Sequence, residues 1–219
     1  MGGPALGRIE ARGRVLDLAD GAGVFAQGDA ADAVYAILGG PGQVRIGAVE
    51  RDSRGLMVEL LGPGEIFGEI GVMDGSVRTA DATAGLVRLL RVGAPVFLEA
   101  LATEPALGRN LCRLLAARLR HTFALLQDAT FGSLEVRLAR QILYLARRGG
   151  RCTEQGLRLA GRCRQGDLAD MRGTTTRSII PILNVWRQSG VVAYELARAQ
   201  LTLTGEAALQ ALVEKGATG

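Results

Sequence analysis

The sequence predicts an α+β chain in two parts. An all-β first half is joined by one long helix to a mainly helical second half that ends in a small hairpin. Two observations predict this fold. Residues 14–95 consist of short apolar runs separated by glycine-rich breaks. Residues 94–129 contain a single glycine and are rich in Leu, Ala and Arg, which are strong helix formers. The chain has 219 residues, 48% of them hydrophobic, and is long enough to bury an ordinary core.

The first half, residues 1–105, predicts short antiparallel strands. Breaks such as Gly39-Gly40 and Gly62-Pro63-Gly64 fall at the close spacing that is typical of a sandwich or barrel. The expected strands are Val24-Phe25, Val34–Leu38, Gln43–Ile46, Leu56–Leu61 and Leu86–Val92.

The long helix is predicted over residues 106–131. Residues of its apolar stripe follow one another at steps of three or four, so they share one helix face. They are Leu111, Leu115, Leu119, Thr122, Leu126 and Ala129. Such a stripe fits a coiled-coil contact with a second copy of the chain, and it fits equally well a single helix lying on its own domain. The spacing leaves both alternatives open.

The remaining segment, residues 132–219, predicts a winged helix-turn-helix. A helix is expected from Ser133 to Arg148, with Ser133 as its cap. Residues 165–173 then predict a short helix that ends at Gly173, and a second helix follows after a tight turn. The runs 191–194 and 200–203 predict the hairpin. Helix-turn-helix spacing alone is only moderately specific.

Charge is divided unequally between the two parts. Residues 1–105 hold 9 arginines against 14 acidic residues, a formal −5, whereas residues 106–219 hold 17 basic against 8 acidic residues, a formal +9. The basic part is therefore the one expected to meet a nucleic-acid backbone. We find no apolar run near the roughly 20 residues needed to cross a bilayer, and no secretion signal at residues 1–10, so we expect a cytoplasmic protein.

The sequence contains few residues that could act as catalytic groups or metal ligands. The three cysteines, Cys112, Cys152 and Cys163, lack metal-site spacing, and His121 is the only histidine. A hydrolase or a phosphodiesterase would need an activated nucleophile or a metal cluster. We therefore expect no enzyme activity, no metal and no cofactor.

Residues 67–80 carry the most informative pattern. Gly68 allows a ligand to approach the backbone closely, Arg78 can fork onto a phosphate, and Thr79 adds a hydroxyl. Glu69 can accept hydrogen bonds from sugar hydroxyls. This combination of residues is suited to bind a phosphorylated sugar. The alternative is an ordinary ion pair between Glu69 and Arg78.

Taken together, the motifs resemble the CRP/FNR superfamily of bacterial transcription factors, the relatives of the cyclic-AMP receptor protein and the fumarate–nitrate regulator. The resemblance covers nearly the whole chain. It is carried by Asp20-Gly21, the run 25–32 with Tyr35, the run 61–69, Arg78-Thr79-Ala80 and the run 165–186. It implies an N-terminal β-roll, a dimerisation helix, DNA and RNA polymerase as partners, and a homodimer.

The resemblance also implies a nucleotide site. The backbone near Gly68 and Ile70 would hold a cyclic nucleotide, Glu69 the ribose 2′-hydroxyl, and Arg78 with Thr79 the cyclic phosphate. Thr122 falls where the cyclic-AMP branch has a base-contacting threonine, although its hydroxyl could instead bond its own backbone. Phe123 replaces a serine of that branch. Cyclic AMP is therefore the first expectation and cyclic GMP the second. A ligand-independent regulator with a relic pocket is a further alternative.

The DNA-reading helix departs from the family pattern. Thr175, Thr176 and Arg177 stand where many members have Ser-Arg-Glu, and Pro181 stands where they have a second arginine. We expect Thr175 and Gln165 to contact phosphate groups of the DNA. We expect Thr176 and Arg177 to contact DNA as well, and Arg177 can make two hydrogen bonds to a guanine. The usual family operator is not expected.

Overall fold

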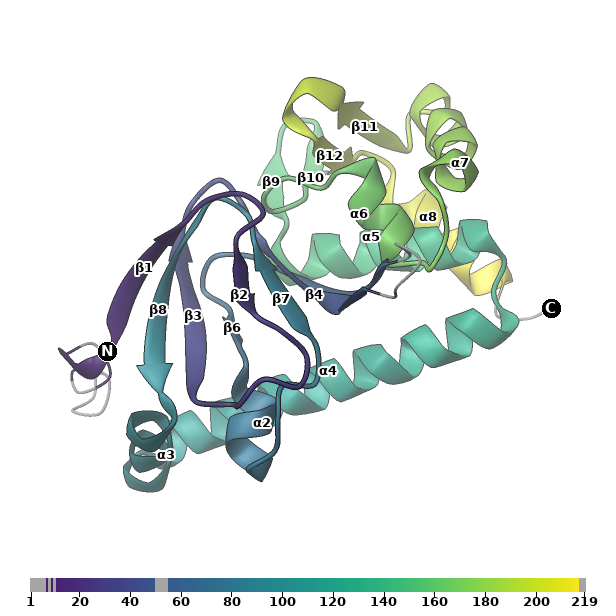
Figure 1. Cartoon of the computed structure of the whole chain (residues 1–219). Coiled ribbons are helices and arrows are strands. Elements are labelled where there is room, and N and C mark those ends of the chain that lie inside the picture. The colour runs from purple at the N-terminus through teal and green to yellow at the C-terminus, as the bar shows by residue number, and fades with distance from the viewer. Residues whose placement is uncertain (1–6, 8, 10, 50–54, 217–219) are drawn as a thin grey trace. The chain divides into compact units, whose positions relative to one another are not determined.

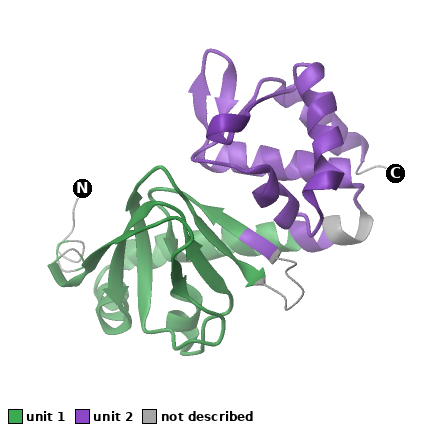
Figure 2. Cartoon of the chain, turned by 45° about the horizontal axis from the view of Figure 1, so that its top comes forward, with its two compact units in different colours: residues 1–48, 59–123 green, residues 49–58, 124–219 purple. Residues whose placement is uncertain are grey.

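The chain forms two compact units in the computed structural model (Figure 2). The first contains residues 1–48 and 59–123, and the second contains residues 49–58 and 124–219. The structure describes residues 7, 9, 11–49 and 55–216, without the side chains of 49, 55 and 128–131. The predicted stripe residue Ala129 is thus outside the described side chains. Within the described residues, no helix combines the length and apolar character that a membrane crossing requires.

Two four-stranded sheets are formed by the first half of the chain (Figure 1). One has the order β1-β8-β3-β6 and the other β2-β7-β4-β5. The strands are β1 (Arg14–Leu18), β2 (Gly23–Phe25), β3 (Ala33–Gly39), β4 (Val44–Val49), β5 (Gly55–Leu61), β6 (Ile66–Phe67), β7 (Asp81–Ala84) and β8 (Val87–Gly93). Most of the residues in these sheets belong to the first unit, and residues 55–58 of β5 are grouped with the second. The all-β prediction is confirmed, and β1, β6 and β7 are additions to it.

Strand alternation explains the core of the first unit. Ala33, Tyr35 and Ile37 of β3 lie on one face of the strand because successive side chains point to opposite faces. They are buried together with Phe67 of β6 and Leu89 of β8. Tyr35 and Phe67 stack with ring centroids 5.2 Å apart.

The helices of the first unit include α2 (Glu69–Asp74), α3 (Ala94–Thr103) and the first part of α4 (Pro105–Phe131). Leu111 of α4 is 4% exposed and packs in a core cluster with Phe97 of α3 and Val92 of β8. Leu119, Phe123 and Leu126 are instead 57–61% exposed. The stripe is therefore divided, since its beginning packs on its own domain and its later part is uncovered in this chain.

Among its described residues, the second unit includes the end of α4, four further α-helices, a short 3-10 helix, η1 (Leu196–Arg198), and a small sheet of order β11-β12-β10-β9. The further α-helices are α5 (Leu134–Gly149), α6 (Gln165–Asp170), α7 (Thr176–Gln188) and α8 (Glu206–Lys215). The strands are β9 (Arg151–Thr153), β10 (Gly156–Arg158), β11 (Val192–Glu195) and β12 (Gln200–Leu203). The predicted hairpin is present as β11 and β12, which pair antiparallel.

Local chemistry sets the ends of these helices. The Ser133 side chain accepts a hydrogen bond from the backbone N–H of Val136 at 3.3 Å, which confirms it as the cap of α5. The first helix of the helix-turn-helix ends at Asp170, earlier than predicted, and Gly173 lies in the turn with φ 58°. The second helix, α7, continues through Pro181. It is held to α5 by Trp186, whose ring N–H donates to Glu135 at 3.2 Å.

Candidate functional site

The glycine at the start of α2 is required by the structure around it. Gly68 has φ 80°, a left-handed conformation that favours glycine. A Cβ at this position would lie 2.8 Å from Nη1 of Arg78 and 3.3 Å from the Phe25 ring. Any side chain at position 68 would therefore displace the arginine.

Arg78 lies beneath this glycine and is 2% exposed. Its Nη1 donates to the carbonyl of Gly68 at 2.7 Å, and its Nη2 donates to the carbonyl of Ala33 at 2.8 Å. The guanidinium also stacks on Phe25, with its central carbon 4.3 Å from the ring centroid. Asp32 supplies a longer ion pair at 3.4 Å. Arg78 is thus buried, oriented and part of the domain's packing.

Glu69 is 1% exposed and is paired with Arg118 of α4, not with Arg78. Nη1 of Arg118 donates to Oε1 of Glu69 at 2.5 Å, and Nη2 donates to the carbonyl of Ile66 at 2.6 Å. The ion pair considered as an alternative to a ligand site, Glu69 with Arg78, is therefore not formed. Arg118 is a further site residue that the sequence motifs do not predict, although it lies one helical turn before Thr122 and thus on the same face.

Three buried polar atoms at this site have no hydrogen-bond partner among the described residues. They are one acceptor, Oε2 of Glu69, and two donors, Nε of Arg78 and Nε of Arg118. Buried polar groups are normally paired, so each such atom calls for an explanation. A ligand that supplies a hydroxyl and a negatively charged oxygen would satisfy the Glu69 oxygen and the Arg78 N–H.

The other predicted nucleotide contacts are exposed. Ile70 is 43% exposed on α2, and Thr79 follows Arg78 on the surface. The Thr122 hydroxyl donates to the carbonyl of Arg118 at 3.0 Å, four residues back on its own helix. Phe123 is 58% exposed. The structure therefore brings Gly68, Glu69 and Arg78 together, whereas α4 reaches this group through Arg118.

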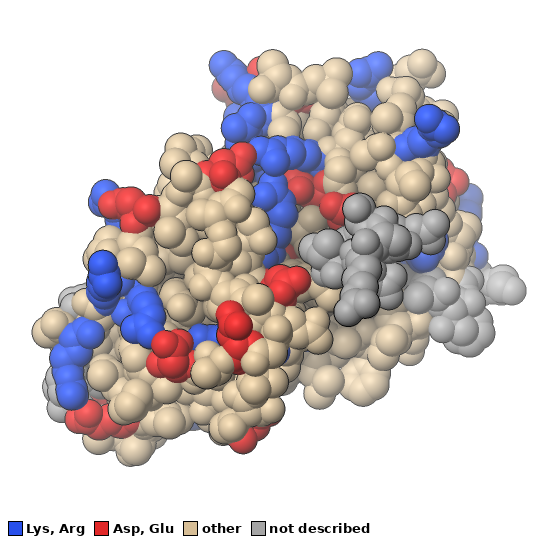
Figure 3. Space-filling model, in the orientation of Figure 1, with Lys and Arg blue, Asp and Glu red and all other residues tan. Residues whose placement is uncertain are grey.

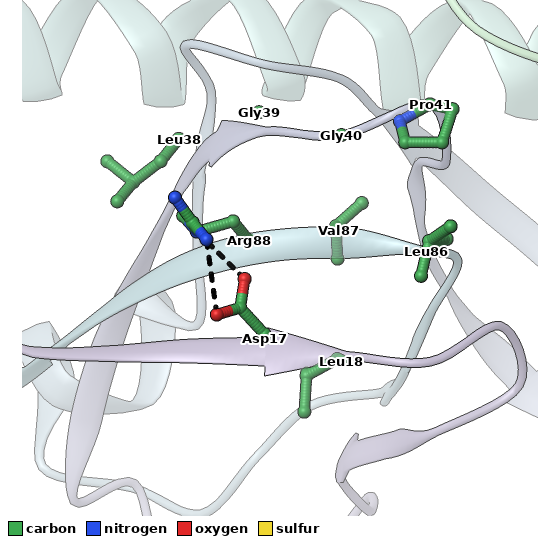
Figure 4. A pocket seen from close by; sticks show the side chains of 9 residues that line it. All are labelled: Asp17, Leu18, Leu38, Gly39, Gly40, Pro41, Leu86, Val87 and Arg88. Carbon is green, nitrogen blue, oxygen red and sulfur yellow. Dashed lines mark hydrogen bonds and ion pairs between the residues drawn. The ribbon is translucent and has the colours of Figure 1, made fainter.

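A separate hollow of about 370 Å³ lies on the same unit (Figure 4). Asp17 and Arg88 face each other across one side of it, with hydrogen bonds of 2.8 and 3.3 Å, and this contact lowers the pKa of Asp17. Its remaining lining is formed by Leu18, Leu38, Gly39, Gly40, Pro41, Leu86 and Val87. None of the predicted site residues belongs to it.

Three of the four predicted DNA contacts lie at the start of α7, and the fourth lies at the start of α6. Thr175, Thr176 and Arg177 are exposed, and the hydroxyl of Thr175 lies 3.1 Å from that of Ser178. Gln165 is the first residue of α6 and is half-buried. On the face drawn in Figure 3, basic side chains predominate over the second unit. These features agree with a surface for a polyanion.

The cysteines and the acidic residues offer no second site. Cys163 is buried, and burial raises the pKa of its thiol, so it is a poor nucleophile. Cys112 and Cys152 are exposed. No group of three His, Cys, Asp or Glu residues is arranged for a metal in the described part of the chain.

Comparison with known proteins agrees with this organisation. Residues 15–104 match the family model of the cyclic nucleotide-binding domain, and residues 136–212 match that of the Crp-like helix-turn-helix domain. A "CRP-like cAMP-activated global transcriptional regulator" of Mycobacterium tuberculosis is 31% identical over 181 residues, which cover 82% of this chain and 80% of that protein. The chain belongs to the CRP/FNR superfamily. As a CRP/FNR protein it is a transcription regulator with a cyclic-nucleotide domain and a DNA-binding domain, and not an enzyme.

Further relatives support the family assignment of this CRP/FNR protein. The "Cyclic AMP receptor protein" of Thermus thermophilus is 32% identical and covers 77% of this chain and 74% of that protein. The solved structure of FixK2 from Bradyrhizobium japonicum has a TM-score of 0.79 at 20% identity and covers 91% of this chain and 96% of that chain. At that identity the structural match supports the fold alone.

Proposed function

We propose that this regulator is a homodimer that binds cyclic AMP at the Gly68–Arg78 site and, when loaded, binds specific DNA through α7 in the cytoplasm. RNA polymerase is the proposed protein partner at the promoter, and the nucleotide is the only small-molecule effector proposed. Cyclic GMP is the runner-up ligand, and a ligand-independent regulator is the second alternative. The two relatives described above are named for cyclic AMP, which favours the first choice.

The observation that carries the proposal is that two of the three unsatisfied buried atoms at this site are an acceptor and a donor placed for a ligand, Oε2 of Glu69 and Nε of Arg78. A ribose hydroxyl donates to a carboxylate, and a cyclic phosphate accepts from a guanidinium. Gly68, which has no side chain and is partly exposed, leaves the backbone next to both groups open to a ligand. Thr79 adds a hydroxyl at the surface of the same segment. The ribose hydroxyl would therefore bond the unpartnered oxygen of Glu69, and the phosphate would accept from the unpartnered N–H of Arg78.

The base would lie toward α4, where Thr122 and Phe123 are both exposed. Phe123 can stack on a purine, and the Thr122 hydroxyl can turn from its own backbone to the base. A threonine hydroxyl donates to guanine O6 as readily as it accepts from adenine N6. The choice between the two purines therefore depends on measurement.

Arg118 gives the ligand a route to α4. Arg118 donates a hydrogen bond to the carboxylate of Glu69 and so joins α2 to α4. A ligand hydroxyl that also donates to this carboxylate would change the hydrogen bonding of Arg118. Because α4 continues beyond this contact to Phe131, a shift at Arg118 would reach the exposed part of the helix. The nucleotide can act only through different affinities for the two arrangements of this contact.

The exposed part of α4 is the proposed dimer contact. Leu119 and Leu126 are seven residues apart with Phe123 between them, the repeat of a coiled-coil seam. We expect Leu126→Glu to convert the dimer to a monomer, because a charge in an apolar seam is desolvated without a partner. Ala117→Glu, an exposed position away from the stripe, is the matched control and should stay dimeric. Analytical ultracentrifugation measures the difference, and a dimeric Leu126→Glu would contradict this assignment.

The function is tested by selecting bound duplexes from a randomised DNA pool, with and without cyclic AMP or cyclic GMP. Calorimetric titration with both nucleotides runs alongside. The proposal expects an enriched site, tight cyclic AMP binding, and DNA affinity that rises with that nucleotide. Equal DNA affinity with and without either nucleotide would support the relic-pocket alternative, and a response to cyclic GMP alone would support the runner-up.

A further inference from the structure

The outward face of α7 carries two exposed apolar residues, Pro181 and Val185, among polar and basic ones. Arg177, Pro181, Asn184 and Gln188 follow one another at steps of four, three and four, so they share one face. Val185 lies beside them and is 59% exposed. The opposite face carries Ile179, Leu183 and Trp186, which are 0–4% exposed and form the core.

We propose that Pro181 and Val185 form an apolar ridge that reads thymine 5-methyl groups in the major groove, beside a guanine read by Arg177. This inference rests on the proposed DNA-binding function and concerns the base sequence that α7 prefers. A dimer contacts two DNA half-sites, one with each protomer. Each half-site would then contain a thymine next to that guanine.

The chemistry of the ridge identifies its partner. Pro181 has no N–H and no polar side-chain atom, and Val185 offers only methyl groups, so neither can hydrogen-bond a base edge. In the major groove the one apolar feature of a base pair is the thymine 5-methyl group, and apolar side chains contact it. The first turn of α7 contains no acidic residue, and its 13 residues include none at all. The helix can therefore approach a polyanion without repulsion.

Packing in its own domain does not explain the ridge. Val185 is more than half exposed, while its neighbour Trp186 is 4% exposed in the core. Pro181 is exposed as well and removes one backbone hydrogen bond from the helix interior, which is unfavourable for helix stability. A residue that weakens its helix and contributes little to its core is more readily explained by what its exposed face contacts.

The experiment uses the full-length protein with cyclic AMP and the duplex enriched from the random pool. Each thymine of the half-site is replaced in turn by deoxyuridine, which removes the 5-methyl group and keeps every hydrogen-bonding atom. We expect one or more positions next to the guanine to lose about fourfold in affinity per half-site, the factor for burial of one methyl-sized group. The Pro181→Ala/Val185→Ala double variant should bind the thymine and deoxyuridine duplexes equally.

Controls separate this inference from misfolding. Leu98→Ala changes a 42% exposed leucine of α3 in the other unit and should keep the full deoxyuridine penalty. Pro181→Ala alone should raise the melting temperature, because it restores a helix hydrogen bond, while it lowers affinity for the thymine duplex. Full affinity for deoxyuridine duplexes, or a penalty that persists in the double variant, would overturn the inference. A pool that yields no enriched sequence in any condition would instead overturn the proposed DNA-binding function.

Discussion

Replacing Arg78 with alanine is expected to weaken cyclic AMP binding by about 10- to 100-fold. The charge-assisted hydrogen bond from Nε of Arg78 to the phosphate is lost, and such a bond contributes about 1.5–3 kcal/mol. The substitution also removes the partners of the Gly68 and Ala33 carbonyls, so the free energy of unfolding should fall by about 1–3 kcal/mol. Calorimetric titration measures the first effect and thermal unfolding the second.

Two further variants test whether the loss belongs to the phosphate contact. Arg78→Lys keeps the charge but lacks the guanidinium Nε–H, so its affinity should lie between those of the wild type and Arg78→Ala. Arg88→Ala removes an exposed arginine that pairs with Asp17 on the same unit, and nucleotide binding should stay at the wild-type level. If a folded Arg78→Ala protein binds the nucleotide normally, Arg78 does not hold the phosphate.

Replacing Arg118 with methionine is expected to destabilise the first unit by about 3 kcal/mol. Glu69 is 1% exposed, and breaking a buried ion pair from one side leaves an uncompensated charge in the interior. The double variant Arg118→Met/Glu69→Gln should recover much of that stability, because the unpaired charge is then absent. Neither variant should give the normal nucleotide response, since Glu69 and α4 are no longer joined.

The single tryptophan makes this prediction specific to one unit. Trp186 belongs to the second unit, so its fluorescence reports unfolding there, whereas calorimetry follows both transitions. The calorimetric transition of the first unit should move and the fluorescence transition should not. Arg120→Met, an exposed arginine on the same helix, is the control. Wild-type stability in Arg118→Met would mean that the ion pair contributes nothing to the fold.

Predictions that depend on neighbouring residues were the accurate ones. Strand β3 follows from an apolar run between glycine breaks, and α5 begins at the serine that caps it, because alternation and capping act over a few residues. The position of Gly68 follows from the same kind of reasoning. Short elements were missed. The two residues of β6 carry no periodic signal, and β6 exists because Tyr35 and Ala36 of β3 pair with it.

Contacts between residues far apart in the sequence cannot be predicted from local sequence patterns. Glu69 and Arg118 are 49 residues apart, and nothing in either local sequence distinguishes this pair from a pair between Glu69 and Arg78. The stripe on α4 shows the same difficulty. Its spacing is uniform, yet Leu111 is buried on the β domain and Leu126 is exposed. The division depends on where the helix leaves the surface of the sheet.

The sequence by itself determined the family, the two-part architecture and the positions of the glycine, acid and arginine of the proposed nucleotide site. These features are set by residue type and spacing, which local backbone conformation follows directly. Only the tertiary structure decided that Arg78 is buried on Phe25, that Glu69 is held by α4, and that Pro181 and Val185 lie on an exposed face. The physical reason is that burial and charge pairing depend on which distant segments meet, and that depends on the packing of the whole domain.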